Sequence, residues 1–366
     1  MKNMKKLMAM MLVLLSVFFY ACDDDEPEAL SPENAKTTLN NLSTQMSTDF
    51  AQMQEAEGMA AMQALMNMPD PFSMPEKSNL RTAVIPNIYE SLIPFSKEIK
   101  TKPDYKSEGF DFNAHKGTYT WNSGTQSWDK TANANYIIIN FPTEGSNTNN
   151  AKLTISNYAE DVNYNPTAIS AKLDVDNVKI IEITFSATWN TDDSPKTLSI
   201  NIYLKPFTFN GTFNQSTTTA TVGFSILLES TRIFNTSLTV TFTDNTQETI
   251  KKVTGYIQYR EIKISAAINV ENIEKIFEQM EAGTSPYTTI DEIVDALNKE
   301  IDAKVTKNGA LVAKIKLDIS TEGLTIVLEF SDGSTEPALP FFESFIASIE
   351  EFFDLIEDYF GDDEVN

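Results

Sequence analysis

Hydrophobic and polar residues alternate through the middle of the chain, from Val178 to Lys263. The clearest alternating runs are Lys179–Trp189, Thr197–Lys205, Thr219–Leu228 and Ser237–Thr243. Successive side chains of a strand point to opposite faces, so a period of two predicts strands with one buried and one solvated face. Burial of one face favours an antiparallel sheet, because all-parallel sheets are covered on both faces.

Clusters of turn-forming residues separate these runs, and more strands are expected on either side of them. The predicted turns are Asn190–Pro195, Pro206–Gln215 and Asp244–Gln247. Earlier strands are predicted at Asn135–Phe141, Lys152–Ser156 and Ala168–Val175. Later strands are predicted at Leu311–Ile319 and Leu324–Phe330, with a tight turn between them.

Four stretches have the 3.6-residue period of amphipathic helices. The first has Ser31 as its N-cap and Pro32 at its first position, and its Met-rich stripe extends to about Met68. Such a stripe is typical of core packing, or alternatively of an adaptable ligand surface. The others are Val270–Glu281, Ile290–Lys304 with a capping box of Thr289 and Glu292, and 340–360, which is rich in Phe.

These elements predict an α+β fold. We expect a large antiparallel, curved β-sheet whose apolar face is covered by the N-terminal Met-rich and C-terminal Phe-rich helices. Residues 32–104 are predicted to form a helical N-terminal segment. Residues 105–366 are predicted to form the sheet with helices at 270–304 and 340–360, in one domain with that segment.

Two tryptophans fall in a predicted hairpin, Tyr119–Trp128, with Ser-Gly at its tip. A two-residue loop would place Tyr119 opposite Trp128. Paired aromatic side chains are typical of cross-strand packing, and alternatively they stack on a sugar ring. Together with Trp189, at the end of a predicted strand, Trp121 and Trp128 are therefore the candidate ligand-binding residues.

The chain is strongly acidic, with a formal net charge of −24. Removing residues 1–21, which hold Lys2, Lys5 and Lys6, leaves 25 basic against 52 acidic residues, a charge of −27. This balance argues against a nucleic-acid partner, since that affinity depends on basic side chains. It also argues against a surface that lies on anionic lipid head groups, and it indicates solubility through mutual repulsion.

Cysteine and histidine are nearly absent, with one of each, Cys22 and His115. The chain therefore cannot form an internal disulfide or a Cys/His zinc site, and a metal would have to be a hard cation bound by oxygens. The pairs Asp174/Asp176 and Asp192/Asp193 do not match calcium-loop spacing and are interpreted as turns. No phosphate-binding glycine loop, nucleophile elbow or catalytic His115 partner is evident, and no cofactor is implied.

The first 22 residues form the most specific motif. Three lysines in Met1–Lys6 precede an apolar stretch, Leu7–Tyr20, that is short for a membrane span, and the motif ends in Ala21-Cys22. This resembles a bacterial lipoprotein signal, although Phe19 and Tyr20 depart from its usual residues. The resemblance implies that Cys22 is acylated and anchors the protein in a membrane. An ordinary secretory signal is the alternative.

Acidic residues follow the cysteine directly: Asp23, Asp24, Asp25 and Glu26. They resemble the export tag after the lipid-bearing cysteine of Bacteroidota surface lipoproteins, which implies exposure on the outer leaflet of the outer membrane. The alternative is a solvated acidic tether. Residues 22–31 are predicted to form a flexible tether of at most about 30 Å.

The leading hypothesis is a non-enzymatic outer-membrane surface lipoprotein that binds an apolar or amphipathic ligand or a partner protein. A sheet with helices over one apolar face resembles the curved-sheet lipid-carrier folds of bacterial envelopes. The alternative is a glycan-binding or adhesive surface module, and the third is a hydrolase that uses two carboxylates. The expected partners are the membrane, through the anchor, and a lipid, glycan or protein ligand.

Overall fold

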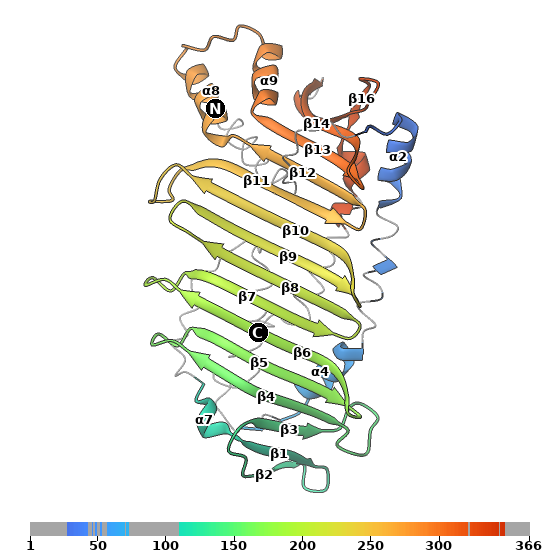
Figure 1. The fold of residues 1–366 in the computed structure, drawn as a ribbon, viewed down its shortest axis with the longest axis vertical. Coiled ribbons are helices and arrows are strands. Elements are labelled where there is room, and N and C mark those ends of the chain that lie inside the picture. The colour runs from blue at the N-terminus through green and yellow to red at the C-terminus, as the bar shows by residue number, and fades with distance from the viewer. Residues whose placement is uncertain are drawn as a thin grey trace. The chain divides into compact units, whose positions relative to one another are not determined.

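A computed structural model of the chain contains a sixteen-stranded, mostly antiparallel open sheet with a few helices (Figure 1). It describes residues 28–42, 46, 48, 49, 52, 57–69, 71, 72, 110–320, 323–343 and 345–347. Strands β3 to β16 are neighbours in sequence order, and β1 lies between β3 and the edge strand β2. The predicted α+β class with a large antiparallel sheet is confirmed.

The chain divides into two compact units. Unit 1 comprises Met1–Thr48, Gln215–Gly223 and Arg232–Glu350, and unit 2 comprises Asp49–Asn214, Phe224–Thr231 and Glu351–Asn366. Two strands fall partly in each unit, β9 (Thr219–Leu228) and β10 (Thr231–Phe242).

Unit 2 holds the first strands of the sheet and the helices α4 (Glu57–Met66) and α7 (Phe112–His115). Its strands are β1 (Gly117–Asn122), β2 (Ser127–Thr131), β3 (Ile137–Phe141), β4 (Ala151–Glu160), β5 (Pro166–Val175), β6 (Val178–Trp189), β7 (Pro195–Leu204) and β8 (Phe207–Gln215). One pair departs from the antiparallel prediction, because β1 and β3 run parallel.

The apolar side of β6 and β7 forms much of the core of unit 2. The alternating residues Ile181, Ile183, Ile200 and Ile202 are buried, as the period of two predicts. Helix α4 packs on these two strands. A side chain at Gly58 would overlap Leu204, so the glycine permits the close approach of helix and sheet.

Unit 1 holds the later strands of the sheet and the helices α2 (Pro32–Asn40), α8 (Val270–Glu281) and α9 (Ile290–Lys299). Its further strands are β11 (Ile250–Tyr259), β12 (Ile262–Ile268), β13 (Ile301–Lys307), β14 (Ala310–Ser320), β15 (Gly323–Glu329) and β16 (Thr335–Pro337). Helix α2 packs on β14, α8 on β11, and α9 on β13 and β14. The apolar sides of β12 and β13 are buried, from Ile262 to Ile268 and from Ile301 to Val305.

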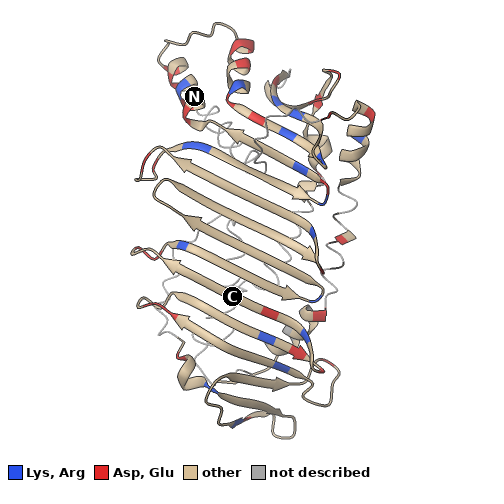
Figure 2. Cartoon of the chain, viewed as in Figure 1, with Lys and Arg blue, Asp and Glu red and all other residues tan. Residues whose placement is uncertain are grey.

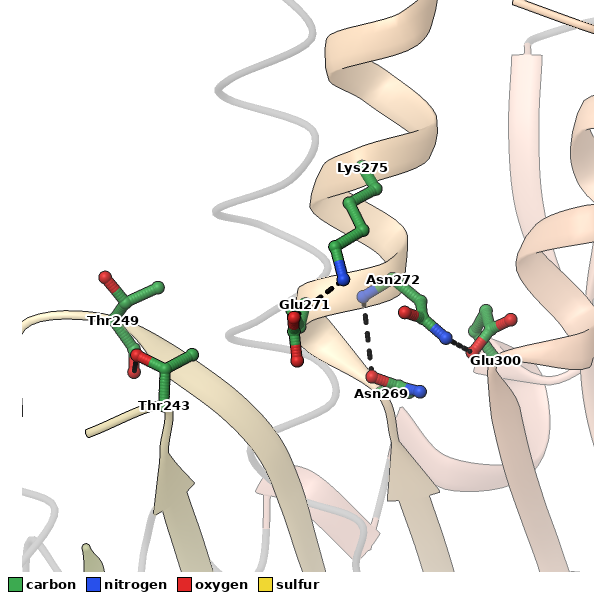
Figure 3. Close-up of polar contacts among 7 residues, drawn as sticks. All are labelled: Thr243, Thr249, Asn269, Glu271, Asn272, Lys275 and Glu300. Atoms are coloured by element: carbon green, nitrogen blue, oxygen red, sulfur yellow. Dashed lines mark hydrogen bonds and ion pairs between the residues drawn. The ribbon is translucent and has the colours of Figure 1, made fainter.

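Polar contacts fix the ends of these helices (Figure 3). The Asn269 side chain accepts a hydrogen bond from the backbone N–H of Asn272, and the Asn272 amide donates to Glu300 at 2.9 Å, which joins the start of α8 to the end of α9. The predicted capping box of Thr289 and Glu292 is confirmed. Ser31 occupies the predicted N-cap of α2 but makes no side-chain capping bond.

Two stretches were assigned to the wrong kind of element from the sequence. Pro206–Gln215, expected to be a turn, is mostly strand β8, because Phe207 and Phe209 alternate with polar residues and are buried. The helix expected at Ile290–Lys304 ends at Lys299, and its last residues belong to β13, where Ile301 and Ala303 continue with a period of two. The turn between β7 and β8 is only Lys205-Pro206, so Pro206 does mark a turn, whereas Gly211 lies within the strand.

The long terminal helices predicted from the sequence are described in part. The first predicted helix, within 31–68, contains the described helices α2 and α4. In the last one, at 340–360, the described residues 340–343 and 345–347 are helical. Phe342 and Phe345 are buried, as expected for the apolar stripe. Ile346 of that stripe is half-buried, while its later positions, and all of residues 73–109, lie outside the described residues.

The described chain begins in contact with the sheet. Ala29 forms an isolated parallel bridge with Leu311, next to the start of β14. Leu311 N–H donates to the Glu28 carbonyl, and Leu30 N–H donates to the Leu311 carbonyl, each at 2.8 Å. Residues 28–30, which the sequence analysis placed in the tether, are therefore hydrogen-bonded to unit 1.

Candidate functional site

The β1–β2 hairpin pairs its two tryptophans. Trp121 lies directly opposite Trp128, and the rings meet edge to face with centroids 5.2 Å apart. The loop is longer than the two residues considered, so Tyr119 lies opposite Lys130 and not opposite Trp128. The Trp128 indole N–H donates to the Pro69 carbonyl at 2.9 Å, so this indole anchors the chain after α4.

Trp189 lies away from that pair. It is at the end of β6, and its indole N–H donates to the Pro166 carbonyl at 2.8 Å. Four strand spacings separate β1 from β6 in the sheet order, which is about 19 Å at ~4.8 Å per spacing. The three tryptophans therefore do not form one binding surface.

His115 lies in an aromatic cluster of unit 2. Its ring stacks on Phe110 with centroids 5.2 Å apart, and Phe72 lies 4.9 Å away. Tyr158 contacts Phe110 edge to face, and its hydroxyl donates to Glu160. Burial raises the pKa of Tyr158, and the Glu160 carboxylate raises this pKa further. The cluster holds the segments around Phe72 and Phe110 on the sheet, which is a packing role.

Three of the four paired aspartates lie in turns, as interpreted from the sequence, but Asp174 lies in strand β5, so the interpretation is wrong for that residue. Asp174 pairs with Lys172 at 2.9 Å, and Asp176 is in the turn between β5 and β6. Asp193 accepts a hydrogen bond from the Asn165 amide at 2.8 Å, which links two hairpin loops. No group of three His, Cys, Asp or Glu side chains suited to a metal ion occurs among the described residues.

A group of lysines on the polar face of unit 1 is a stronger candidate. Lys263 of β12, Lys304 of β13 and Lys314 of β14 lie on the same face, and Lys304 is directly opposite Lys314. We call these three residues the lysine cluster. Figure 2 shows the basic residues on β12 to β14 in this acidic chain.

Polar and aromatic groups border the lysine cluster. The Lys263 ammonium lies 4.5 Å from the centre of the Tyr256 ring, a cation–π distance. The Tyr256 hydroxyl accepts a hydrogen bond from the Asn235 amide at 2.7 Å. Lys263, Lys304, Tyr256 and Asn235 are all half-buried, so this part of the face is only partly solvated.

The electrostatics of the lysine cluster favour an anion. Among the described residues, no carboxylate lies within ion-pair distance of Lys263, Lys304 or Lys314. Burial lowers the pKa of Lys263, and the nearby Lys304 ammonium lowers this pKa further. An anionic group placed between these two ammonium groups would relieve their repulsion and form charge-assisted hydrogen bonds.

Sequence reasoning missed this cluster. The alternation of β12 and β14 predicts that Lys263 and Lys314 are on polar faces, but Lys304 was assigned to a helix. Helices α8 and α9 separate β12 from β13 in the chain, so their pairing was not evident. A period of two at Ile301, Ala303 and Val305 was the available signal.

Cys22 and the acidic residues Asp23, Asp24, Asp25 and Glu26 lie outside the described residues. Within the part of the chain that the structure describes, none of the helices has both the length and the apolar character that crossing a membrane requires.

Comparisons with known proteins give no family. No protein-family model matches the chain, and no curated protein matches it. Among solved structures, a distant match is a porin-like protein from Bacteroides vulgatus ATCC 8482, at 8% sequence identity and a TM-score of 0.19. The match covers 53% of this chain and 92% of that chain. A TM-score this low does not establish a shared fold.

Proposed function

We propose that the protein is a non-enzymatic, lipid-anchored binding protein of the outer membrane that binds acidic glycans on the polar face of unit 1. The observation that carries this proposal is the pair of half-buried residues Lys263 and Lys304, whose ammonium groups have no carboxylate partner among the described residues. The proposal develops the glycan-binding alternative and moves its site from the tryptophans to the lysine cluster.

The surroundings of the lysine cluster suit a saccharide chain. The ammonium groups would bind its carboxylate or sulfate groups, and such charge-assisted hydrogen bonds are stronger than neutral ones. The Tyr256 hydroxyl and the Asn235 amide lie beside them and match the hydroxyl groups of a sugar. The net charge of −24 opposes non-specific binding of polyanions, so affinity would depend on this local basic group.

Binding measurements with charged and neutral oligosaccharides of equal length test the proposal. We expect binding of carboxylated or sulfated chains that weakens with salt and with rising pH, because the lowered pKa of Lys263 makes it lose its charge earlier than an ordinary lysine. The double variant Lys263→Gln/Lys304→Gln should bind at least about tenfold more weakly, since each charge-assisted bond contributes about 1.5–3 kcal/mol.

The matched control removes two lysines from elsewhere. Lys152 and Lys196 are exposed on unit 2, and Lys152→Gln/Lys196→Gln lowers the net charge equally. It should bind acidic glycans as the parent does. Equal loss in both double variants, or equal binding of neutral chains, would contradict a site at the lysine cluster.

The anchor is a separate part of the proposal. The lipoprotein-like signal and Cys22 support acylation of that residue. Cys22→Ala should therefore move the protein from the membrane fraction to the soluble fraction, which immunoblotting of the separated fractions measures. An alanine variant that is processed normally and still sediments with the outer membrane would refute the anchor.

An apolar or amphipathic ligand remains the second candidate. It is favoured by β10, where Leu238, Val240 and Phe242 are on the apolar side of the sheet but only half-buried. Extraction and mass analysis of lipids that co-purify with the protein would test it. Purification without any bound lipid would leave this candidate unsupported.

A further inference from the structure

Residues 28–30 are docked on the sheet of unit 1. The two backbone hydrogen bonds between Glu28–Leu30 and Leu311 are joined by a third, from the Ser331 hydroxyl to the Leu30 carbonyl at 2.7 Å. These bonds hold the segment against β14 and the turn that precedes β16. The described contacts with the sheet therefore begin at Glu28, three residues before Ser31, where the tether prediction ends.

The direction of residues 28–30 along the sheet follows from the bridge geometry. Ala29 and Leu311 pair in parallel, so Glu28 lies toward the start of β14 and the β13–β14 turn at Asn308-Gly309. Ile262 lies opposite Lys307, which places the β11–β12 turn beside that turn. We call these two turns, residues 259–262 and 307–310, the turn end of unit 1.

We infer that the turn end of unit 1 faces the surface of the membrane that holds the anchor, and that it stays within about 20 Å of that surface. The inference rests on the acylation of Cys22 in the proposed function. Glu28 follows Cys22 by six residues, and a fully extended chain spans at most ~3.3–3.6 Å per residue. A lipid on Cys22 therefore cannot lie farther than this from Glu28.

The turn end carries charges of both signs. The tether, and not attraction between these charges and the lipid head groups, would therefore hold it near the membrane. Glu261 and Lys307 are 3.8 Å apart and offset one another, and the turn also carries Arg260. Such a mixed surface has no strong preference for anionic head groups. The partner is thus the head-group zone of the anchoring leaflet, whatever its net charge.

Energy transfer from single labelled positions to a lipid acceptor tests the orientation. The full acylated protein is reconstituted in phosphatidylcholine vesicles that carry an acceptor dye on a lipid head group. Donor dyes are placed at Glu261→Cys, in the turn end, or at Asn245→Cys, in the exposed β10–β11 turn. Cys22 is the chain's only native cysteine, and acylation blocks its thiol. The two positions are separated by β11, or about 30 Å at ~3.3 Å per residue.

We expect markedly stronger energy transfer from a donor at Glu261→Cys than from one at Asn245→Cys. The donor at Glu261→Cys should also give the stronger transfer in vesicles that contain anionic lipid. A Gly/Ser insert of about 20 residues between Glu26 and Pro27 adds a mean span of roughly 25 Å and should reduce transfer from Glu261→Cys. Protein that does not float with the vesicles would overturn the anchor itself. Floated protein with equal or reversed transfer at the two positions would overturn the orientation and leave the anchor intact.

Discussion

Three aspartates at turns share one arrangement of hydrogen bonds. In each, the carboxylate accepts both the backbone N–H and the hydroxyl of the Ser or Thr two residues later. The pairs are Asp192 with Ser194, Asp244 with Thr246, and Asp332 with Ser334, at distances of 2.6 to 3.0 Å. This geometry favours the charged carboxylate and is a common way for Asp to stabilise a turn.

The Asp244 turn should therefore lose stability in acid. The Thr246 hydroxyl, and then its backbone N–H, lowers the pKa of Asp244. A pKa that is lower in the folded than in the unfolded state stabilises the protein above about pH 4 and loses this effect as the pH falls through the folded value. Asp244→Asn, which stays neutral, should reduce the dependence of the urea midpoint on pH between about pH 5 and pH 3.

The control for that measurement is Asp295→Asn on the exposed side of α9. The Asp295 carboxylate accepts no hydrogen bond among the described residues, so this variant removes one carboxylate without removing a turn hydrogen bond. If Asp244→Asn leaves the profile unchanged, the turn hydrogen bonds do not favour the charged form in solution.

Burial at Phe345 gives a second prediction for single residues. Phe345 is 1% exposed in the short helical segment before the end of the described chain, and the neighbouring Glu343 is exposed. Phe345→Ala should lower the free energy of unfolding by about 3–5 kcal/mol, while Glu343→Ala should change it little. Urea unfolding checks both. A Phe345→Ala variant as stable as the parent would mean that this segment is not docked in solution.

In the β1–β2 hairpin, the residue pattern determines the face of each tryptophan but not the register of the two strands. The predicted pairing of Tyr119 with Trp128 is wrong by two residues, but Tyr119, Trp121 and Trp128 share one face, because a shift of two residues preserves the face. The register itself depends on the loop length, which Ser123-Gly124 did not fix. The structure has a four-residue loop, Ser123–Gln126, so the partner of Trp128 changes from Tyr119 to Trp121.

At the level of elements, the strands with strict alternation were predictable and the transitions between elements were not. β9 and α8 have the predicted bounds, because their periods are unbroken and turn residues or caps flank them. β8 was missed because Pro206 precedes it and its Asn and Gly residues are typical of loops, although burial of Phe207 and Phe209 decides its conformation. Tertiary packing overrides local propensity in such strands.

The junction of α9 and β14 provides a prediction for an element. The Asn298 side chain acts as a strand neighbour for Leu317, accepting from its N–H at 2.8 Å and donating to its carbonyl at 2.9 Å. Asn298→Ala would leave both backbone groups without this partner, at a cost of roughly 1–3 kcal/mol for each group that stays buried.

Asn298→Asp separates hydrogen bonding from size. It keeps the acceptor for Leu317 N–H but places a second acceptor against the Leu317 carbonyl, so it should also destabilise the junction. The exposed neighbour Lys299→Ala is the control and should be close to neutral. Hydrogen exchange at Leu317, compared across the three variants, measures the effect locally. Unchanged protection in Asn298→Ala would show that water or another group replaces the side chain.

At the scale of the whole molecule, the lysine cluster and the turn end lie at the same end of unit 1. Lys263 directly follows Ile262, which belongs to the turn end, so the lysine cluster begins about 3 Å along the strand from that end. Neither feature was predictable from the sequence, because both depend on which strands pair and on where residues 28–30 dock. An acidic glycan bound there would lie close to the anchoring membrane.

The last prediction concerns the side of the membrane on which the proposed binding face of unit 1 would be displayed. If Asp23, Asp24, Asp25 and Glu26 act as an export signal, their charge should be required for surface exposure. Replacing them with Asn, Asn, Asn and Gln removes the charge and keeps the tether length, so the spacing between Cys22 and Glu28 is unchanged. The variant should be acylated but retained on the periplasmic face, and proteases added to whole cells should no longer cleave it.

The matched comparison is the Gly/Ser insert after Glu26, which keeps the charge and changes the length. It should remain accessible on whole cells and retain binding of acidic glycans by those cells, whereas the neutral variant should lose both. Purified neutral variant should still bind acidic glycans as the parent does, because the lysine cluster is unchanged. If the neutral variant stays fully accessible to protease on intact cells, these residues are a solvated tether and not an export signal, and surface display must depend on another part of the chain.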